Sequence, residues 1–149
     1  MRAWPRLARN SFPSKCHPLC YLRLNQSHKV NDKPRNWVRV AGHIAEIPFG
    51  SNNLAEVPAG GRTVLLVKGA DGIHAVAPKC PHAGGALVHG WLDGSGNVVC
   101  PLHRYRFCPS NGRNVSGEGY YLKRWPVEER ADGVYVGLEA GFLSGLFGA

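Results

Sequence analysis

Short apolar or alternating runs, separated by glycine-containing turns, make up most of the chain between residues 36 and 139. Residues 36–40 alternate between apolar and polar side chains, which is typical of a half-buried strand. Residues 63–68 and 73–77 are β-rich runs joined through Asp71-Gly72, a pair that suits a tight turn with positive φ. Similar pairs of runs occur at 91–100 and 125–138. Several short strands with regular turns predict an all-β fold, a small antiparallel sandwich or barrel.

Length and composition agree with one β domain and two flanking segments. A chain of 149 residues can bury one substantial core, and 19 glycines and 11 prolines favour turns over long helices. We divide it into a basic arm (1–35), an ordered domain (36–139) and an apolar C-terminal tail (140–149). We expect the tail to pack on the sandwich, with a docking peptide for another subunit as the alternative.

Positive charge is concentrated in the arm. The formal net charge is +8, but residues 1–35 hold eight basic residues and one acidic residue, a balance of +7. Residues 36–149 carry the remaining +1. The ordered domain is therefore nearly neutral, and its charge gives no support to a nucleic-acid partner.

The arm has no sustained hydrophobic period, and we expect it to be poorly ordered. Its arginine-rich, acid-poor composition is similar to that of organelle transit peptides, but it lacks the continuous apolar segment of a secretory signal. It could equally be an upstream start outside the working protein. Cys16 and Cys20 have no partner ligands nearby in the sequence, so we expect no functional metal site there.

Cysteine usage points to metal binding rather than to disulfides. Five cysteines are an odd number, and two of them are spaced with histidines, which favours a metal site in a reducing compartment. No run approaches the roughly 18 apolar residues needed for a membrane span. We therefore expect a cytoplasmic protein without a membrane span.

Two segments carry the candidate chemistry. Each opens with Cys-Pro after a strand-like run: Cys80-Pro-His82, then seventeen residues, then Cys100-Pro-Leu-His103. Proline makes each segment a rigid loop at the end of a strand. Two such loops, each with one thiolate and one imidazole, can hold one metal centre between them.

The donor set allows two kinds of centre. A tetrahedral zinc site with two cysteines and two histidines is the main competitor, but zinc fingers usually keep the two cysteines together and the two histidines together. Here each loop mixes the two types, which suits a binuclear iron–sulfur cluster with both cysteines on one iron and both histidines on the other. Cys108 and His89 lie nearby without a place in this set.

At this point the chain resembles the Rieske family, whose motif is C-x-H, about fifteen to seventeen residues, then C-x-x-H. The resemblance covers roughly residues 36–139. It implies a [2Fe-2S] cluster held by Cys80, His82, Cys100 and His103. It also implies an antiparallel β-sandwich with a smaller cluster-binding subdomain, with the cluster near one tip and the histidines facing solvent.

The chain departs from the high-potential members of that family. Those proteins join the two loops by a disulfide, and the corresponding positions here are Gly85 and Leu102. They also place serine and tyrosine hydroxyls beside the cluster, at positions that match Tyr105 and Phe107 here. Fewer hydrogen-bond donors stabilise the reduced state less, so the resemblance is to the lower-potential, ferredoxin-like branch.

Three functions follow as expectations. The first is a one-electron carrier, a ferredoxin component that passes electrons from a reductase to an oxygenase-type terminal enzyme. The second is the small electron-transfer subunit of an NAD(P)H-dependent nitrite reductase, with its large subunit as partner. The third is a zinc-stapled interaction module. The sequence shows no nucleophile–base pair and no phosphate loop, so we expect no independent catalytic site.

Overall fold

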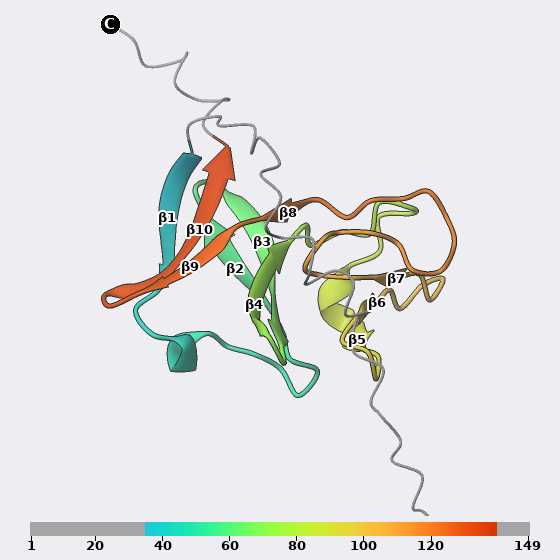
Figure 1. The fold of residues 1–149 in the computed structure, drawn as a ribbon, viewed down its shortest axis with the longest axis horizontal. Helices are drawn as coiled ribbons and strands as arrows, with labels where there is room; N and C mark the ends of the chain where they lie inside the picture. The colour runs from blue at the N-terminus through green and yellow to red at the C-terminus, as the bar shows by residue number, and fades with distance from the viewer. Residues whose placement is uncertain (1–34, 140–149) are drawn as a thin grey trace, which may run out of the picture.

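The computed structural model describes residues 35–139 as strands, turns and two short 3-10 helices (Figure 1). The strands are β1 (Arg35–Ala41), β2 (Leu54–Ala59), β3 (Arg62–Gly69), β4 (Gly72–Val76), β5 (Trp91–Leu92), β6 (Val98–Val99), β7 (Arg106–Phe107), β8 (Arg124–Trp125), β9 (Val127–Arg130) and β10 (Gly133–Glu139). The 3-10 helices are η2 (Ile44–Glu46) and η3 (Leu87–His89). The all-β prediction is confirmed.

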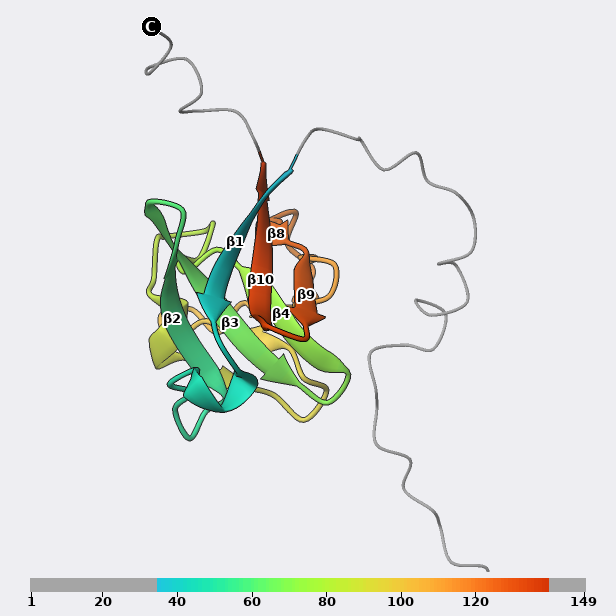
Figure 2. The same cartoon turned by 90° about the vertical axis from the view of Figure 1, so that its left-hand side faces the viewer.

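Three antiparallel sheets form the layers of the fold. Their strand orders are β1-β10-β9, β2-β3-β4-β8 and β5-β6-β7. The first two sheets face each other as a sandwich, and Figure 2 shows β1, β9 and β10 in front of β2, β3 and β4. The third, smaller sheet lies on the opposite side of the central sheet, at the right of Figure 1. We call the two larger sheets the base.

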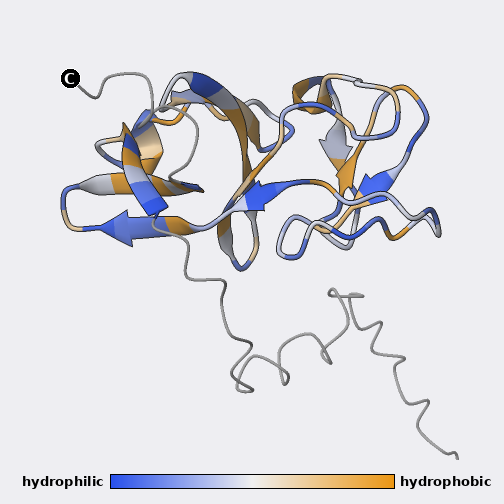
Figure 3. Cartoon of the chain, turned by 90° about the horizontal axis from the view of Figure 1, so that it is seen from above, coloured by the Kyte–Doolittle hydropathy of each residue, from blue (hydrophilic) through white to orange (hydrophobic). Residues whose placement is uncertain are grey.

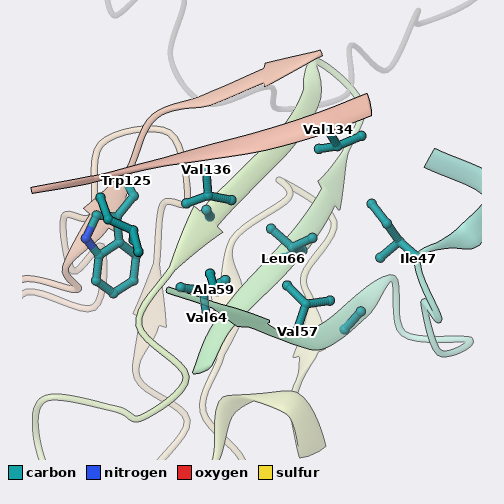
Figure 4. Close-up of a cluster of buried hydrophobic side chains, with 11 residues drawn as sticks. Ile47, Val57, Ala59, Val64, Leu66, Trp125, Val134 and Val136 are labelled. Atoms are coloured by element: carbon teal, nitrogen blue, oxygen red, sulfur yellow. The ribbon is translucent and has the colours of Figure 1, made fainter. Parts of the chain in front are cut away.

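Strand β3 is central because both of its faces are buried. Val64 and Leu66 point into the core between the two base sheets, which Figure 4 shows together with Val57 and Val136. Leu65 and Val67 alternate with them and belong to a second core on the other face. A strand buried on both sides needs a continuous apolar run, which explains the uninterrupted apolar residues here.

The second core joins the base to the small sheet. It contains Leu65, Val67 and Val76 from the base and Leu87, Val98, Phe107 and Leu122 from the small sheet and its loops, together with Cys80 and Cys100. Hydropathy colouring shows hydrophobic segments in both parts of the molecule (Figure 3). The two cysteines of the candidate site are therefore anchored in a core that the base helps to build.

Residues 77–123 form an insertion between two adjacent strands of the base. Strand β4 precedes the insertion and β8 follows it, and the two strands pair through Ala75↔Trp125 and Val76↔Arg124. The Ala77 N–H donates to the Lys123 carbonyl oxygen at 2.8 Å, which extends this pairing by one step. We call residues 77–123 the insertion.

Two features of the base differ from the sequence expectation. The run 125–129 is divided by Pro126: the residues before it pair with β4 in the central sheet, and the residues after it pair with β10 in the outer sheet. Strand β2, which contains Pro58, was not predicted. Proline is tolerated there since β2 is an edge strand, where a missing N–H leaves no neighbouring strand unpaired.

The expectations for the arm and the tail fall on residues 1–34 and 140–149, which lie outside the described part of the chain. Arg35, the last residue assigned to the arm, is the first residue of β1. Within residues 35–139, no helix is long and apolar enough to cross a membrane.

Candidate metal centre

The first candidate loop is a tight turn closed by two backbone hydrogen bonds. The Cys80 N–H donates to the Gly85 carbonyl oxygen, and the Gly84 N–H donates to the Cys80 carbonyl oxygen, both at 2.8 Å. Gly84 has a φ of +69°, a conformation that glycine adopts without steric cost. The turn holds the backbone around Cys80 and His82 in one fixed shape.

The second loop repeats this shape. The Cys100 N–H donates to the Tyr105 carbonyl oxygen at 2.9 Å, and the Arg104 N–H donates to the Cys100 carbonyl oxygen at 3.0 Å. Arg104 stands where the first loop has Gly84, and its φ is +59°. A non-glycine residue in this left-handed region costs on the order of 1 kcal/mol. The two loops are therefore structural equivalents, and the second is the strained one.

The two cysteines lie side by side in the interior. Cys80 and Cys100 are both buried free thiols. Burial raises the pKa of the Cys80 thiol above its ordinary value, and the Cys100 thiol adds to this rise, while hydrogen bonding from the backbone N–H groups of His82 and Ala83 opposes it. Those N–H groups favour negative charge on the sulfur, which is the form in which cysteine binds a metal.

The two histidines also lie side by side, nearer the surface. The ring centroids of His82 and His103 are 4.8 Å apart, with an angle of 80° between the ring planes. His103 is exposed and His82 is half-buried. The Nδ1 atom of His82 is buried and has no hydrogen-bond partner. A buried ring nitrogen without a partner is costly unless it binds something, and a metal ligand is the natural occupant of such a position.

The arrangement of the pairs fits a binuclear centre. Within residues 35–139, no three His, Cys, Asp or Glu side chains gather closely enough to hold one metal ion. The donors are instead arranged as one cysteine pair and one histidine pair. A [2Fe-2S] cluster with cysteines on one iron and histidines on the other needs this separation, whereas a single tetrahedral zinc ion needs all four donors around one point.

Two aromatic rings pack against His82, the half-buried member of the histidine pair. Tyr105 packs edge-on against His82 with centroids 4.5 Å apart, and Tyr120 lies 5.3 Å from the same ring. Tyr105 follows directly from the motif, but Tyr120 was not predicted, because it comes from a loop with no chemical signature. Its position depends on how residues 113–121 fold back over β7, where the Val115 N–H donates to the Arg106 carbonyl oxygen at 2.8 Å.

A third turn has the same shape and was not predicted from the sequence. The Cys108 N–H donates to the Arg113 carbonyl oxygen at 2.9 Å, and the Gly112 N–H donates to the Cys108 carbonyl oxygen at 2.7 Å. The sequence feature that could have indicated this turn is a third Cys-Pro pair, Cys108-Pro109. The turn carries Ser110 where the first loop has its histidine, and the Cys108 sulfur lies 3.1 Å from the Ser110 hydroxyl. Cys108 is buried and is not brought to the other two cysteines.

The positions that differ from high-potential Rieske proteins face each other as expected. A Cβ atom placed on Gly85 would lie 2.9 Å from Cδ1 of Leu102 and 3.1 Å from the Cys100 sulfur. Where high-potential members have a disulfide between the loops, Gly85 of one loop packs closely against the Leu102 side chain of the other. Phe107 is fully buried in the second core and offers no hydroxyl.

A side chain from the loop that leads into β2 positions the segment between the two candidate loops. Nδ2 of Asn52 donates to the carbonyl oxygens of Val88 and Gly90, each at 2.9 Å. Gly90 in turn lies against β6, since a Cβ atom placed there would be 2.1 Å from the Val99 carbonyl oxygen. Asn52 therefore fixes the insertion to the base just before β5.

Comparison with known proteins agrees with this geometry. Residues 36–121, more than half of the chain, match the family model of the Rieske [2Fe-2S] domain. Apoptosis-inducing factor 3 from Homo sapiens is 35% identical over 116 residues, which is 76% of this chain but only 18% of that protein. This chain thus spans less than a fifth of the length of that relative.

Two solved structures share the fold. The ferredoxin of carbazole 1,9a-dioxygenase from Nocardioides aromaticivorans has a TM-score of 0.60 and 22% identity, over 69% of this chain and 98% of that one. A protein assigned as the small subunit of an NADH-dependent nitrite reductase from Mycobacterium tuberculosis has a TM-score of 0.60 and 21% identity, over 72% and 98%. These two structures show a shared fold. The match of residues 36–121 to the family model identifies this chain as a member of the Rieske [2Fe-2S] domain family, whose cofactor is a [2Fe-2S] cluster.

Proposed function

We propose that Cys80, His82, Cys100 and His103 hold the [2Fe-2S] cluster and that the chain is a one-electron carrier. The observation that carries this proposal is the pairing of donors by two equivalent turns, with the thiols buried and the imidazoles toward the surface. The cluster, when bound, supplies a centre that takes up and releases a single electron. No further chemistry is required of the chain.

The protein's own residues control where the electron can leave. The buried cysteines place one side of the centre in the second core, away from solvent. The exposed His103 places the other side at the surface, so the imidazole edge is the shortest route to a partner. Tyr105 and Tyr120 pack against His82 and exclude water from part of that edge.

As the biological role we favour a ferredoxin component that delivers electrons from a reductase to an oxygenase-type terminal enzyme. The fold is shared with a ferredoxin of a dioxygenase, and almost all of that chain is covered. The transfer would take place in the cytoplasm, since cysteines used as metal ligands, and a Cys108 that forms no disulfide within residues 35–139, suit a reducing compartment.

A second role is the small electron-transfer subunit of an NAD(P)H-dependent nitrite reductase, because the same fold occurs in a protein of that assignment. The two roles differ in their partners. A stable complex with a large reductase subunit would support the second role. A monomer that exchanges electrons in transient encounters with a flavin reductase and an oxygenase would support the first.

Spectroscopy of anaerobically purified protein tests the cluster assignment. We expect visible absorbance of a [2Fe-2S] centre, an EPR signal after reduction by dithionite, and two irons and two sulfides per chain. Cys80→Ser and His103→Ala should each abolish the signal, whereas Cys108→Ser should keep it. A colourless protein that holds zinc after careful reconstitution with iron and sulfide would contradict the proposal and establish the zinc module.

A further inference from the structure

Charge is distributed unequally between the two parts of the structure. The insertion contains five basic and two acidic residues, a balance of +3. The rest of residues 35–139 contains six basic and seven acidic residues, a balance of −1. Because the insertion lies at one end of the molecule (Figure 1), the end that carries the candidate centre is its positive end.

Three cations of the insertion are exposed and have no acidic partner. Lys79, Arg104 and Arg113 are exposed, and no carboxylate within residues 35–139 lies within 4.0 Å of their charged nitrogens. The base also has exposed cations without a carboxylate within 4.0 Å, such as Arg62 and Arg124, but there six basic residues are balanced by seven acidic ones, and Arg130 pairs with Glu128 at 2.8 Å. Unpaired exposed cations leave a positive field that acts on an approaching protein, whereas paired ones largely cancel.

Arg104 is the most informative of the three. It follows the exposed His103 and occupies the left-handed position for which the equivalent loop uses Gly84. Among residues 35–139, Asn53 is the other non-glycine residue with positive φ. Glycine would adopt this conformation without strain, so the backbone gains nothing from arginine. What arginine adds is a cation beside the exposed imidazole.

Exposed apolar side chains come from the same segments as two of these cations, Arg104 and Arg113. Leu102, which precedes His103, is 59% exposed, and Tyr120, which packs against His82, is 36% exposed. Small electron-transfer interfaces combine an apolar centre with charged residues around it, and the charges set the encounter rate.

We propose that this surface docks a redox protein whose own docking surface is acidic with an apolar centre, and that Arg104 steers the encounter. We call the surface the docking end and define it by Lys79, Leu102, His103, Arg104, Arg113 and Tyr120. The inference rests on the proposed electron-carrier function and specifies its partner. One electron passes between the cluster and the partner's redox centre, and no atom is transferred.

Small redox ions of known charge test the sign of the field. Reduced holoprotein is oxidised in a stopped-flow instrument by hexacyanoferrate(III), an anion of charge 3−, or by hexaamminecobalt(III), a cation of charge 3+. Each ion takes one electron from the reduced protein. We expect added salt to slow oxidation by the anion and to accelerate oxidation by the cation, because salt screens an attraction in one case and a repulsion in the other.

Arg104 variants separate steering from structure. Arg104→Gly should slow oxidation by the anion at low salt by about threefold or more, yet unfold at a temperature no lower than the wild type. Arg104→Lys keeps the charge and should keep the rate. Arg35→Gln, an exposed position on β1 in the outer sheet, is the matched control and should leave the rate unchanged. A slower rate in the control equal to that of Arg104→Gly would overturn the role of Arg104.

A redox-inert probe distinguishes failure of this inference from failure of the proposed function. Hexacyanochromate(III) is a paramagnetic anion that broadens NMR signals where it approaches, without electron transfer. We expect broadening at residues 113–121 and little at β9. Uniform broadening, or salt effects of the opposite sign in a protein that shows the cluster's EPR signal, would refute the docking end alone. Absence of the EPR signal would instead refute the electron-carrier function.

Discussion

Leu65 and Leu66 are neighbours on β3, and replacing each by alanine should affect the protein in different ways. Both side chains are fully buried, but they point to opposite faces of the strand. Leu66 belongs to the core between the base sheets, and Leu65 belongs to the second core with Cys80 and Cys100. We predict similar losses of global stability and a faster loss of the cluster in Leu65→Ala only.

The expected magnitude follows from burial. Removing a fully buried leucine side chain to alanine costs about 2–5 kcal/mol, including the cavity that remains. A cost of about 3 kcal/mol would lower the melting temperature of a domain of this size by roughly 12–24 °C. If Leu65→Ala lowers the free energy of local opening of the second core by this amount, the fraction of molecules with that core open rises by up to about a hundredfold.

Two measurements decide the outcome. Urea unfolding followed by tryptophan fluorescence gives the change in the free energy of unfolding. Bleaching of the cluster's visible absorbance in native buffer with a chelator present gives the rate of cluster loss. Leu65→Ala should bleach many times faster than Leu66→Ala at a comparable unfolding free energy. Equal bleaching rates, or faster bleaching in Leu66→Ala, would refute the assignment of the cysteines to the core beneath Leu65.

Three further predictions concern the insertion. Asn52→Ala removes two donated hydrogen bonds, so it should lower the free energy of unfolding by about 1–3 kcal/mol in urea titrations. Asn36→Ala, at an exposed position of β1, is the control and should leave the free energy of unfolding unchanged. Burial raises the pKa of Asp93, but hydrogen bonds from Asn97 and Ser95 outweigh it and hold the pKa below 3.8. The stabilisation from Asp93 is therefore present above that value and lost as pH falls through the folded pKa. Thermal melts from pH 6 to 2 should fall less steeply in Asp93→Asn. Replacing Arg104 and Arg106 together by glutamine should lower the reduction potential in voltammetry, because both cations favour the more negative state; an unchanged or raised potential would contradict this.

The sequence predicted those parts of the fold that depend on local chemistry. The chain turns from β3 to β4 through Ala70-Asp71, and Gly72, which begins β4 opposite Gly69, has the expected positive φ, +130°. The alternation at residues 36–40 became β1, which begins one residue earlier. Turn residues and side-chain alternation act over a few positions, so they can be recognised without knowledge of the rest of the molecule.

Features that depend on distant partners were not predicted. Strand β2 was not predicted, and its place at the edge of the sheet, which makes Pro58 acceptable there, depends on the pairing of distant strands. Strand β7 has two residues, too few for any pattern. At the candidate site the motif indicated the four donors and their division into a cysteine pair and a histidine pair, but the contact of Tyr120 with His82 results from how the loops meet in space.

The pairing of β4 with β8 has a consequence for how the domain is connected. The backbone leaves the base at Ala77 and returns at Lys123, and these two residues are already joined by a hydrogen bond of 2.8 Å. A short hairpin turn could therefore replace residues 78–122 without breaking the continuity of the base. The second face of β3 would then be exposed to solvent, so Leu65 and Val67 would have to be replaced by polar residues. The electron-transfer unit is in this sense an insertion between two adjacent strands of a β-sandwich. The apolar side chains of the second core hold it against that sandwich.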